Sequence, residues 1–232
     1  MNRKILVVLH SEVSTPGRIG QLLQARGLAV DIRRPCLGES LPPTMADHLG
    51  AVIFGGPMSA NDSDDWIARE IDWIGVPLKE QKPFLGVCLG AQMLSKHLGG
   101  TVGPHRDGFV EIGYYPLRGT RAGGELGPWP AQVYHWHREG FSLPAGAERL
   151  AEGDCFENQA FRYGARAFGI QFHPEVTRLT MHRWTVRAAH RFVLPGAQGA
   201  AAHLAGNLIH DAAVRQWLDL FLDRWLSGTA RQ

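Results

Sequence analysis

Cys88 stands between two glycines at the end of an apolar run, in the segment Gly86-Val87-Cys88-Leu89-Gly90. The residues before it suit a buried strand. The apolar residues after it recur at helical spacing, so we expect Cys88 on a sharp turn from strand to helix. Glycines permit the strained backbone of such a turn. Because a helix N-terminus favours negative charge, the turn would stabilise the thiolate, which is the reactive form of cysteine.

The same turn would leave the backbone amide of Leu89 free to face a developing oxyanion. The five-residue pattern also fits an inert side chain, because free cysteine is among the most buried residue types. The pattern alone therefore leaves two interpretations of Cys88 open, a nucleophile and a packed core residue.

The segment His173-Pro174-Glu175 follows a second strand-like run, residues 168–172. Proline fixes the local backbone between the imidazole and the carboxylate. A cysteine nucleophile needs a base close to it, and the base needs a third group that holds its tautomer and orientation. His173 and Glu175 could fill these two roles, which favours the nucleophile over the packed cysteine.

The chain resembles the class I (triad) glutamine amidotransferases in three motifs, which occur in the order that this family has. The motifs lie within roughly residues 1 to 180 and are Phe54-Gly55-Gly56-Pro57, Gly86-Val87-Cys88-Leu89-Gly90-Ala91-Gln92 and Phe172-His173-Pro174-Glu175. The resemblance implies a free-standing glutaminase-type domain. In it, Cys88, His173 and Glu175 would form a triad that acts on the side-chain amide of glutamine.

The resemblance also implies which residues bind the substrate. It assigns the amides of Gly56 and Leu89 as two oxyanion donors, and glycine suits this task because no side chain blocks its amide. Gln92 lies one helical turn after Cys88 on the same helix face, where the family has a glutamine that helps to bind the substrate. A surface or capping glutamine is the alternative interpretation of Gln92.

Tyr134, His135 and His137 are further candidates for substrate binding, because the corresponding segment of the family lies beside the glutamine. On a strand, His135 and His137 would point to the same face, where they could form a metal-binding pair. No third ligand with a diagnostic spacing is evident in the sequence. We therefore predict no metal site and no cofactor.

Apolar runs that suit buried parallel strands alternate with helical patterns through the first half of the chain. The sequence thus predicts an α/β fold of three layers with a mostly parallel, flavodoxin-like central sheet. Ligands of such sheets gather outside the carboxyl ends of the strands, so Gly56 and Cys88 would face one crevice. The expected core strands are residues 4–9, 29–32, 51–54, 84–87 and 168–172. Three helices are expected between them. The first has its N-cap at Thr15, the second starts at Trp66 and bends near Gly75 and Pro77, and the third starts at Leu89.

In the second half of the chain, shorter apolar runs between Gly and Pro turns predict small antiparallel additions to the sheet. Residues 119–130 are rich in glycine and proline, and we expect a flexible loop there. A helix over 180–192 and a last amphipathic helix capped by Asn207 would follow.

No linker or internal repeat is visible in the sequence. We predict a single domain over residues 1–232, with its core at about 1–180 and C-terminal helices at about 180–228. Hydrophobic residues make up 44% of the 232 residues and charged residues 20%, which fits a soluble globular protein.

The net charge of +2 does not indicate a surface that binds polyanions, so we expect no nucleic-acid partner. The three cysteines are too few and too scattered for a disulfide framework. No apolar run is long enough for a membrane span or a signal sequence, so we expect a cytoplasmic protein without a membrane partner.

The predicted reaction releases ammonia from glutamine through a γ-glutamyl thioester, and the sequence does not identify the ammonia acceptor. It contains no ATP-binding P-loop, so an aminating enzyme would need a separate ATP-dependent synthetase subunit. The alternative is a γ-glutamyl hydrolase or peptidase that uses the same triad on γ-glutamyl conjugates. A non-catalytic binding protein on the same scaffold and an esterase-like hydrolase are less favoured interpretations.

Overall fold

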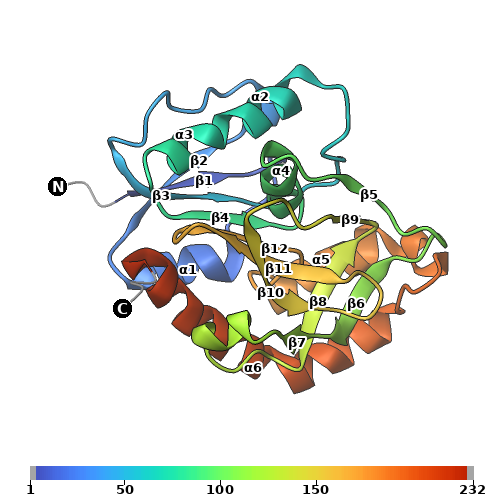
Figure 1. The fold of residues 1–232 in the computed structure, drawn as a ribbon. Helices are drawn as coiled ribbons and strands as arrows, with labels where there is room; N and C mark the ends of the chain where they lie inside the picture. The colour runs from blue at the N-terminus through green and yellow to red at the C-terminus, as the bar shows by residue number, and fades with distance from the viewer. Residues whose placement is uncertain (1–3, 229–232) are drawn as a thin grey trace.

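A computed structural model describes residues 4–228 of the chain, and its centre is a sheet with helices on both faces (Figure 1). Four neighbouring pairs at one side of the sheet are parallel, and three pairs at the other side are antiparallel. The predicted α/β fold is therefore confirmed. The eight strands, in their order across the sheet, are β2 (Ala29–Arg33), β1 (Lys4–Val8), β3 (His48–Ile53), β4 (Phe84–Val87), β12 (Ala167–Ile170), β11 (Asn158–Tyr163), β10 (Ala147–Glu152) and β7 (Arg118–Gly119).

Hydrophobic cores lie on both faces of the parallel strands, because successive residues of a strand point to opposite sides. In β1, Ile5 and Val7 face one core, and Leu6 and Val8 face the other. Burial on both faces explains why the core strands have continuous apolar runs rather than alternating ones. The first core is covered by α1 (Gly17–Ala25) and α6 (Ala200–Ser227), and the second by α2 (Asp65–Trp73), α3 (Gly75–Lys79) and α4 (Leu89–His97).

The start of α1 differs from the prediction. Pro16 rather than Thr15 occupies the N-cap position, and no side chain caps the helix. The predicted bend before Pro77 is present, because α2 ends at Trp73 and α3 begins at Gly75. A short 3-10 helix, η1 (Pro35–Leu37), follows β2.

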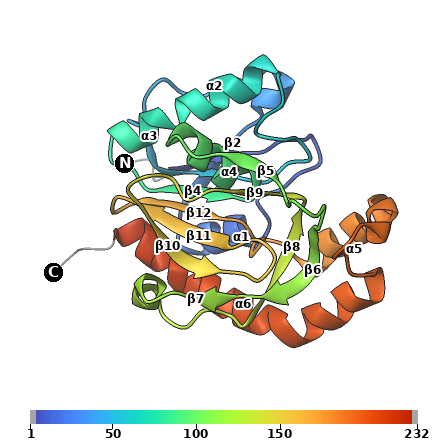
Figure 2. The same ribbon diagram turned by 45° about the vertical axis from the view of Figure 1, so that its right-hand side comes forward.

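Two small antiparallel pairs stand beside the main sheet, as Figure 2 shows. Strand β5 (Val102–Pro104) pairs with β9 (Glu139–Phe141), and β6 (Glu111–Pro116) pairs with β8 (Gln132–His137). These pairs confirm the predicted antiparallel additions, although the sequence did not reveal β9.

The prediction of a flexible loop over 119–130 is wrong. The segment contains a 3-10 helix, η2 (Ala122–Leu126), and the side chain of Leu126 is buried in the core. The indole N–H of Trp129 donates a hydrogen bond of 2.9 Å to the carbonyl of Gly123. Tertiary packing orders this segment, which its local composition does not indicate.

Three helical segments end the described chain, namely α5 (Arg178–Arg187), the 3-10 helix η3 (Ala189–Val193) and α6. Asn207 does not cap α6, because this helix begins seven residues earlier with Gly199 at its N-cap. The predicted apolar face of α6 is buried; it consists of Val214, Trp217, Leu218, Phe221 and Trp225. No helix among residues 4–228 is long and apolar enough to cross a membrane.

Candidate active site

Cys88 occupies the turn between β4 and α4, where its φ of 52° lies in the left-handed region that non-glycine residues rarely adopt. Two glycines make this turn possible. A Cβ on Gly86 would lie 2.4 Å from the carbonyl oxygen of Gly90, and a Cβ on Gly90 would lie 2.1 Å from that of Ile53. The predicted elbow is therefore present, and neither glycine can be replaced without moving the backbone.

Two backbone amides beside Cys88 lack a partner in the part of the chain that the structure describes. Leu89 is the first residue of α4, so its N–H has no acceptor within the helix. The N–H of Gly56 makes no hydrogen bond within residues 4–228. A Cβ on Gly56 would lie 3.1 Å from Cδ2 of Leu89, so the two residues are neighbours. This is an arrangement that can receive an oxyanion.

His173 and Glu175 form a buried pair at the carboxyl end of β12. Nδ1 of His173 donates a hydrogen bond of 2.7 Å to Oε1 of Glu175. Burial alone lowers the pKa of His173, but the Glu175 carboxylate and the Cys88 sulfur outweigh it and raise that pKa to about 10. The raised pKa favours the imidazolium form of His173 at neutral pH.

The thiol and the imidazole meet against Gly55. A Cβ on this glycine would lie 2.9 Å from Cε1 of His173 and 3.8 Å from Sγ of Cys88. The structure thus brings together side chains that are 85 positions apart in the chain. A side chain at position 55 would collide with the imidazole.

The backbone around Glu175 is held by the first turn of α1. The N–H of Arg18 donates a hydrogen bond of 2.8 Å to the carbonyl of Glu175. Gly17 permits this approach, since a Cβ there would lie 2.3 Å from the same oxygen and its φ is 52°. On the other side, the N–H of His173 donates a 2.8 Å hydrogen bond to the carbonyl of Tyr134.

A cavity of about 320 Å³ opens beside these groups. It lies at the carboxyl ends of the parallel strands, as expected for this fold. Its aromatic wall consists of Trp136 and Trp184, and the Trp184 ring packs edge-on against His173 at 5.1 Å between centroids. The other lining residues include Cys88, His173 and Glu175, together with Gly55, Gly56, Ser11, Ser14, Thr15, Thr180, Arg183, Arg187 and Arg191.

A second buried pair, which the sequence did not reveal, supports the glycine turn. Nε2 of His10 lies 2.9 Å from Oε1 of Glu70, and Nδ1 of His10 lies 3.1 Å from the carbonyl oxygen of Gly55. Both oxygens can only accept, so both ring nitrogens carry hydrogens. Burial lowers the pKa of His10, but Glu70 and the nearby carbonyls raise it above its usual value. Because a trans peptide directs its C=O and N–H to opposite sides, fixing the carbonyl of Gly55 also fixes the N–H of Gly56.

Gln92 does not line the cavity. Its side-chain amide donates hydrogen bonds of 2.8 Å to the carbonyl of Glu139 and 3.2 Å to Oε1 of Gln171. In this arrangement Gln92 links α4 to β9 and lies behind the triad. Its part in binding substrate stays a prediction.

Tyr134, His135 and His137 do not line the cavity either, whereas Trp136 on the same strand does. The hydroxyl of Tyr134 pairs with Nδ1 of His203 in α6 at 2.9 Å. Trp136 was not among the predicted site residues. The signal that could have identified it is the alternation of β8, which places it opposite to the two histidines.

His135 and His137 meet a carboxylate that the sequence did not indicate. Oε2 of Glu111, on the neighbouring strand β6, lies 2.9 Å from Nε2 of His137 and 3.4 Å from Nδ1 of His135. Glu111 also accepts a 2.8 Å hydrogen bond from the side chain of Gln159. All three members of the Glu111–His135–His137 cluster are buried and could together hold a metal ion. Glu111 is a possible third ligand, so the argument from the sequence against a metal site no longer holds. The absence of a metal stays a prediction.

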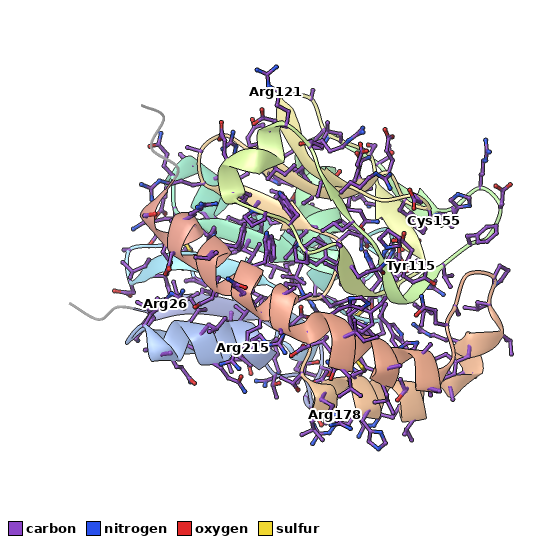
Figure 3. The ribbon with its side chains drawn as sticks, turned by 90° about the horizontal axis from the view of Figure 1, so that it is seen from below. Arg26, Tyr115, Arg121, Cys155, Arg178 and Arg215 are labelled. Atoms are coloured by element: carbon purple, nitrogen blue, oxygen red, sulfur yellow. The ribbon has the colours of Figure 1, made fainter. Side chains whose placement is uncertain are left out.

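Figure 3 labels two neighbours of this cluster, Tyr115 and Cys155. The ring of Tyr115 packs edge-on against that of His135, with centroids 5.8 Å apart. Burial and the negative charge of Glu111 raise the pKa of Cys155 to about 11. The thiol of Cys155 is therefore protonated at neutral pH, unlike a reactive cysteine.

Comparisons with known proteins identify the family of this chain. The model of the family "Glutamine amidotransferase class-I" matches residues 9–188. The chain is 29% identical over 187 residues to the glutamine amidotransferase-like protein YfeJ of Salmonella typhimurium, covering 75% of this chain and 76% of that protein. It is 35% identical over 143 residues to the glutamine-hydrolyzing GMP synthase of Aeropyrum pernix, covering 60% of this chain but only 26% of the synthase.

Solved structures give the same result. The crystal structure of a glutamine amido transferase from Methylobacillus flagellatus has a TM-score of 0.90 at 26% identity, covering 100% of this chain and 97% of the other. A glutamine amidotransferase from Thermotoga maritima has a TM-score of 0.87 at 28% identity, covering 97% and 99%. The family match over most of the chain, with these relatives and folds, establishes that the chain belongs to the class I glutamine amidotransferase family.

Proposed function

We propose that this protein hydrolyses the side-chain amide of glutamine through a triad of Cys88, His173 and Glu175. The observation that carries the proposal is the 2.7 Å hydrogen bond between His173 and Glu175, on the wall of a cavity that also exposes a strained cysteine. The nucleophile, the proton donor and the group that orients it thus border one space.

The first half-reaction begins with the thiolate form of Cys88. It attacks the δ-carbonyl carbon of glutamine. The carbonyl oxygen becomes negative and accepts hydrogen bonds from the backbone N–H groups of Gly56 and Leu89. The C–N bond then breaks as the His173 imidazolium protonates the departing nitrogen, which leaves as ammonia. The products are a γ-glutamyl thioester on Cys88 and a neutral His173.

The second half-reaction hydrolyses this thioester. Neutral His173 takes a proton from water, and the hydroxide attacks the thioester carbonyl. The C–S bond breaks and glutamate leaves, which restores the thiolate and the imidazolium. Glu175 holds the ring in one orientation and stabilises its charge throughout.

Substitution of each cysteine in turn tests the proposal. We expect Cys88→Ser to lower glutamate and ammonia production from L-glutamine by on the order of 10⁴-fold or more, because the nucleophile is lost. Cys36→Ser and Cys155→Ser are matched controls, since both cysteines are also free but lie outside the cavity. Each control is expected to keep the parent rate within about threefold. A Cys88→Ser variant as active as the controls would contradict the proposal.

The acceptor of the ammonia also belongs to the proposal. The chain matches only 26% of a GMP synthase, whose name states that it hydrolyses glutamine. By analogy, we expect that any amination depends on a separate ATP-dependent synthetase subunit. Purification of the tagged protein from its own cells, followed by an assay for ATP-dependent use of the ammonia, tests this expectation. A cytoplasmic location agrees with three free cysteines and stays a prediction.

A further inference from the structure

Three arginines of α5 and η3 line the catalytic cavity, namely Arg183, Arg187 and Arg191. We call them the arginine row. Arg183 and Arg187 are four positions apart in α5, which places them on the same side of that helix, and Arg191 follows in η3. Arg183 and Arg187 are exposed at the mouth, and Arg191 is half-buried.

No described protein group neutralises the arginine row. None of its guanidinium groups makes an ion pair or a side-chain hydrogen bond within residues 4–228. Among the residues of the described chain that line the cavity, only Glu175 carries a carboxylate, and His173 already occupies it. The sequence shows the same segregation, since no Asp or Glu occurs between Glu175 and Asp211. Arg183 and Arg187 are like charges four residues apart, which destabilises α5 slightly, and an anion bound beside them would relieve this repulsion.

The arginine row lies on the side of the cavity from which the amine leaves. His173 protonates the departing nitrogen in the proposed reaction, and the residue that packs on the His173 ring is Trp184 of α5. Trp184 directly follows Arg183 and lies three residues before Arg187. The oxyanion donor Gly56 lies in the turn after β3, and Leu89 begins α4, so both come from segments other than α5 and η3. A group attached to the leaving nitrogen therefore extends toward α5.

We infer that the arginine row is a subsite for an anionic leaving group, so that the preferred substrates are γ-glutamyl amides whose amine carries one or more carboxylates. The inference rests on the proposed function, because it takes Cys88 and His173 as the acyl-transfer centre. A cavity of about 320 Å³ has the size of small-molecule pockets and leaves room beyond the amide nitrogen of glutamine. Hydrolysis then breaks the same C–N bond, and the leaving amine takes the proton from His173.

Three substrates separate the contributions of the leaving group. L-glutamine releases ammonia, and γ-L-glutamyl-methylamide releases methylamine, an alkylamine without a carboxylate. γ-L-glutamyl-L-glutamate releases an amine with two carboxylates. We expect kcat/KM for γ-L-glutamyl-L-glutamate to exceed that for the methylamide by on the order of 10-fold to 100-fold, through contacts between arginine and carboxylate. Raising the salt concentration from 0.05 to 0.5 M should reduce this preference, because exposed ion pairs are screened.

Substitution of the row tests which part of the substrate it binds. Replacing Arg183, Arg187 and Arg191 together by Gln should lower kcat/KM for γ-L-glutamyl-L-glutamate by on the order of 10-fold or more, and change that for L-glutamine by less than about threefold. Replacing the same three residues by Lys keeps the charge and should restore part of the preference. Arg178→Gln is the matched control, since Arg178 belongs to α5 but does not line the cavity and projects from the outer edge of the molecule (Figure 3).

Each outcome of these assays is decisive. Equal kcat/KM for the two conjugates in the parent protein would overturn the inference and leave the proposed function intact. Equal losses on all three substrates in the Gln variant would also overturn it, because the row would then bind the α-carboxylate that they share. No turnover of any of the three substrates by the folded parent protein would contradict the proposed function itself. Thermal unfolding of each variant confirms that it is folded.

Discussion

His173 and His137 are both buried histidines beside a carboxylate, at 2.7 Å from Glu175 and 2.9 Å from Glu111. They differ in what lies on their other side. His173 borders the cavity and the Cys88 thiol, whereas His137 meets a second buried histidine, His135. A histidine–glutamate pair therefore occurs once beside the sulfur of Cys88 and once inside the buried Glu111–His135–His137 cluster.

The pKa values follow from these surroundings. Burial lowers the pKa of both His173 and His135. The Glu175 carboxylate and the Cys88 sulfur outweigh burial at His173 and raise its pKa to about 10. At His135, the neighbour of His137 in the second cluster, burial dominates and lowers the pKa to about 3. The comparison teaches that a carboxylate beside a histidine does not by itself indicate catalysis. Access to a cavity and a nucleophile is what distinguishes the site.

Glu175→Gln is expected to have the largest effect on turnover among substitutions of these carboxylates. The variant loses the group that orients His173 and stabilises its charge, so kcat should fall by on the order of 10²-fold to 10⁴-fold. Glu175 raises the pKa of His173, so this pKa should be lower in the variant. The alkaline limb of its pH profile should therefore shift to lower pH. The pH profile of kcat/KM measures both effects. An unchanged alkaline limb would show that Glu175 does not control the protonation of His173.

Glu111→Gln should affect stability rather than catalysis. It leaves His137 without its carboxylate partner in a buried position, and we expect a loss of roughly 3 kcal/mol in the free energy of unfolding at pH 7. Turnover by the folded variant should stay within about threefold of the parent. Urea unfolding and a glutaminase assay of the same preparation separate the two quantities. Lost activity with unchanged stability would place the Glu111–His135–His137 cluster in the reaction.

The contribution of Glu111 to the free energy of unfolding should depend on pH. Burial raises the pKa of Glu111, but His135 and His137 outweigh it and hold that pKa at about 2, below its usual value of 4.5. The stabilisation is therefore fully present above pH 4.5 and is lost as the pH falls toward 2. The difference in unfolding free energy between parent and Glu111→Gln should accordingly shrink as the pH falls from about 4.5 to about 2. A constant difference would mean that Glu111 is protonated in the folded protein.

Glu70→Gln should have the smallest free-energy effect of the three carboxylate substitutions, although it should lower turnover more than Glu111→Gln does. It removes the charge that holds His10 against the carbonyl of Gly55, and so loosens the peptide that carries the N–H of Gly56. We expect kcat to fall by about 10-fold with little change in KM, because an oxyanion donor acts mainly in the transition state. Steady-state kinetics with glutamine measures this split. A rise in KM alone would show that the pair shapes substrate binding and not the oxyanion site.

Local sequence patterns predicted the elbow well, because its requirements are local. Glycines on both sides of Cys88 and a helical pattern after it can be read within about ten residues. The His173–Glu175 pair is likewise separated by one residue. The parallel strands were equally visible, since burial on both faces leaves continuous apolar runs.

The remaining features depend on partners that are distant in sequence. His10 pairs with Glu70, and His137 with Glu111, across separations that no local spacing records. The alternation of β8 separates Trp136 from the two histidines, but only the closed fold reveals which of the two faces turns toward the cavity. Similarly, the order of residues 119–130 comes from burial of Leu126, which a composition rich in glycine does not indicate.

Trapping the acyl-enzyme tests the central claim most directly. The protein is mixed with L-glutamine, quenched in acid during turnover, digested and analysed by mass spectrometry. We predict that one glutamyl group is attached to the peptide that contains Cys88, and that the adduct is absent from the Cys88→Ser variant. Turnover of glutamine with no adduct on this peptide, or with the adduct on Cys36 or Cys155 instead, would contradict the assignment of Cys88 as the nucleophile.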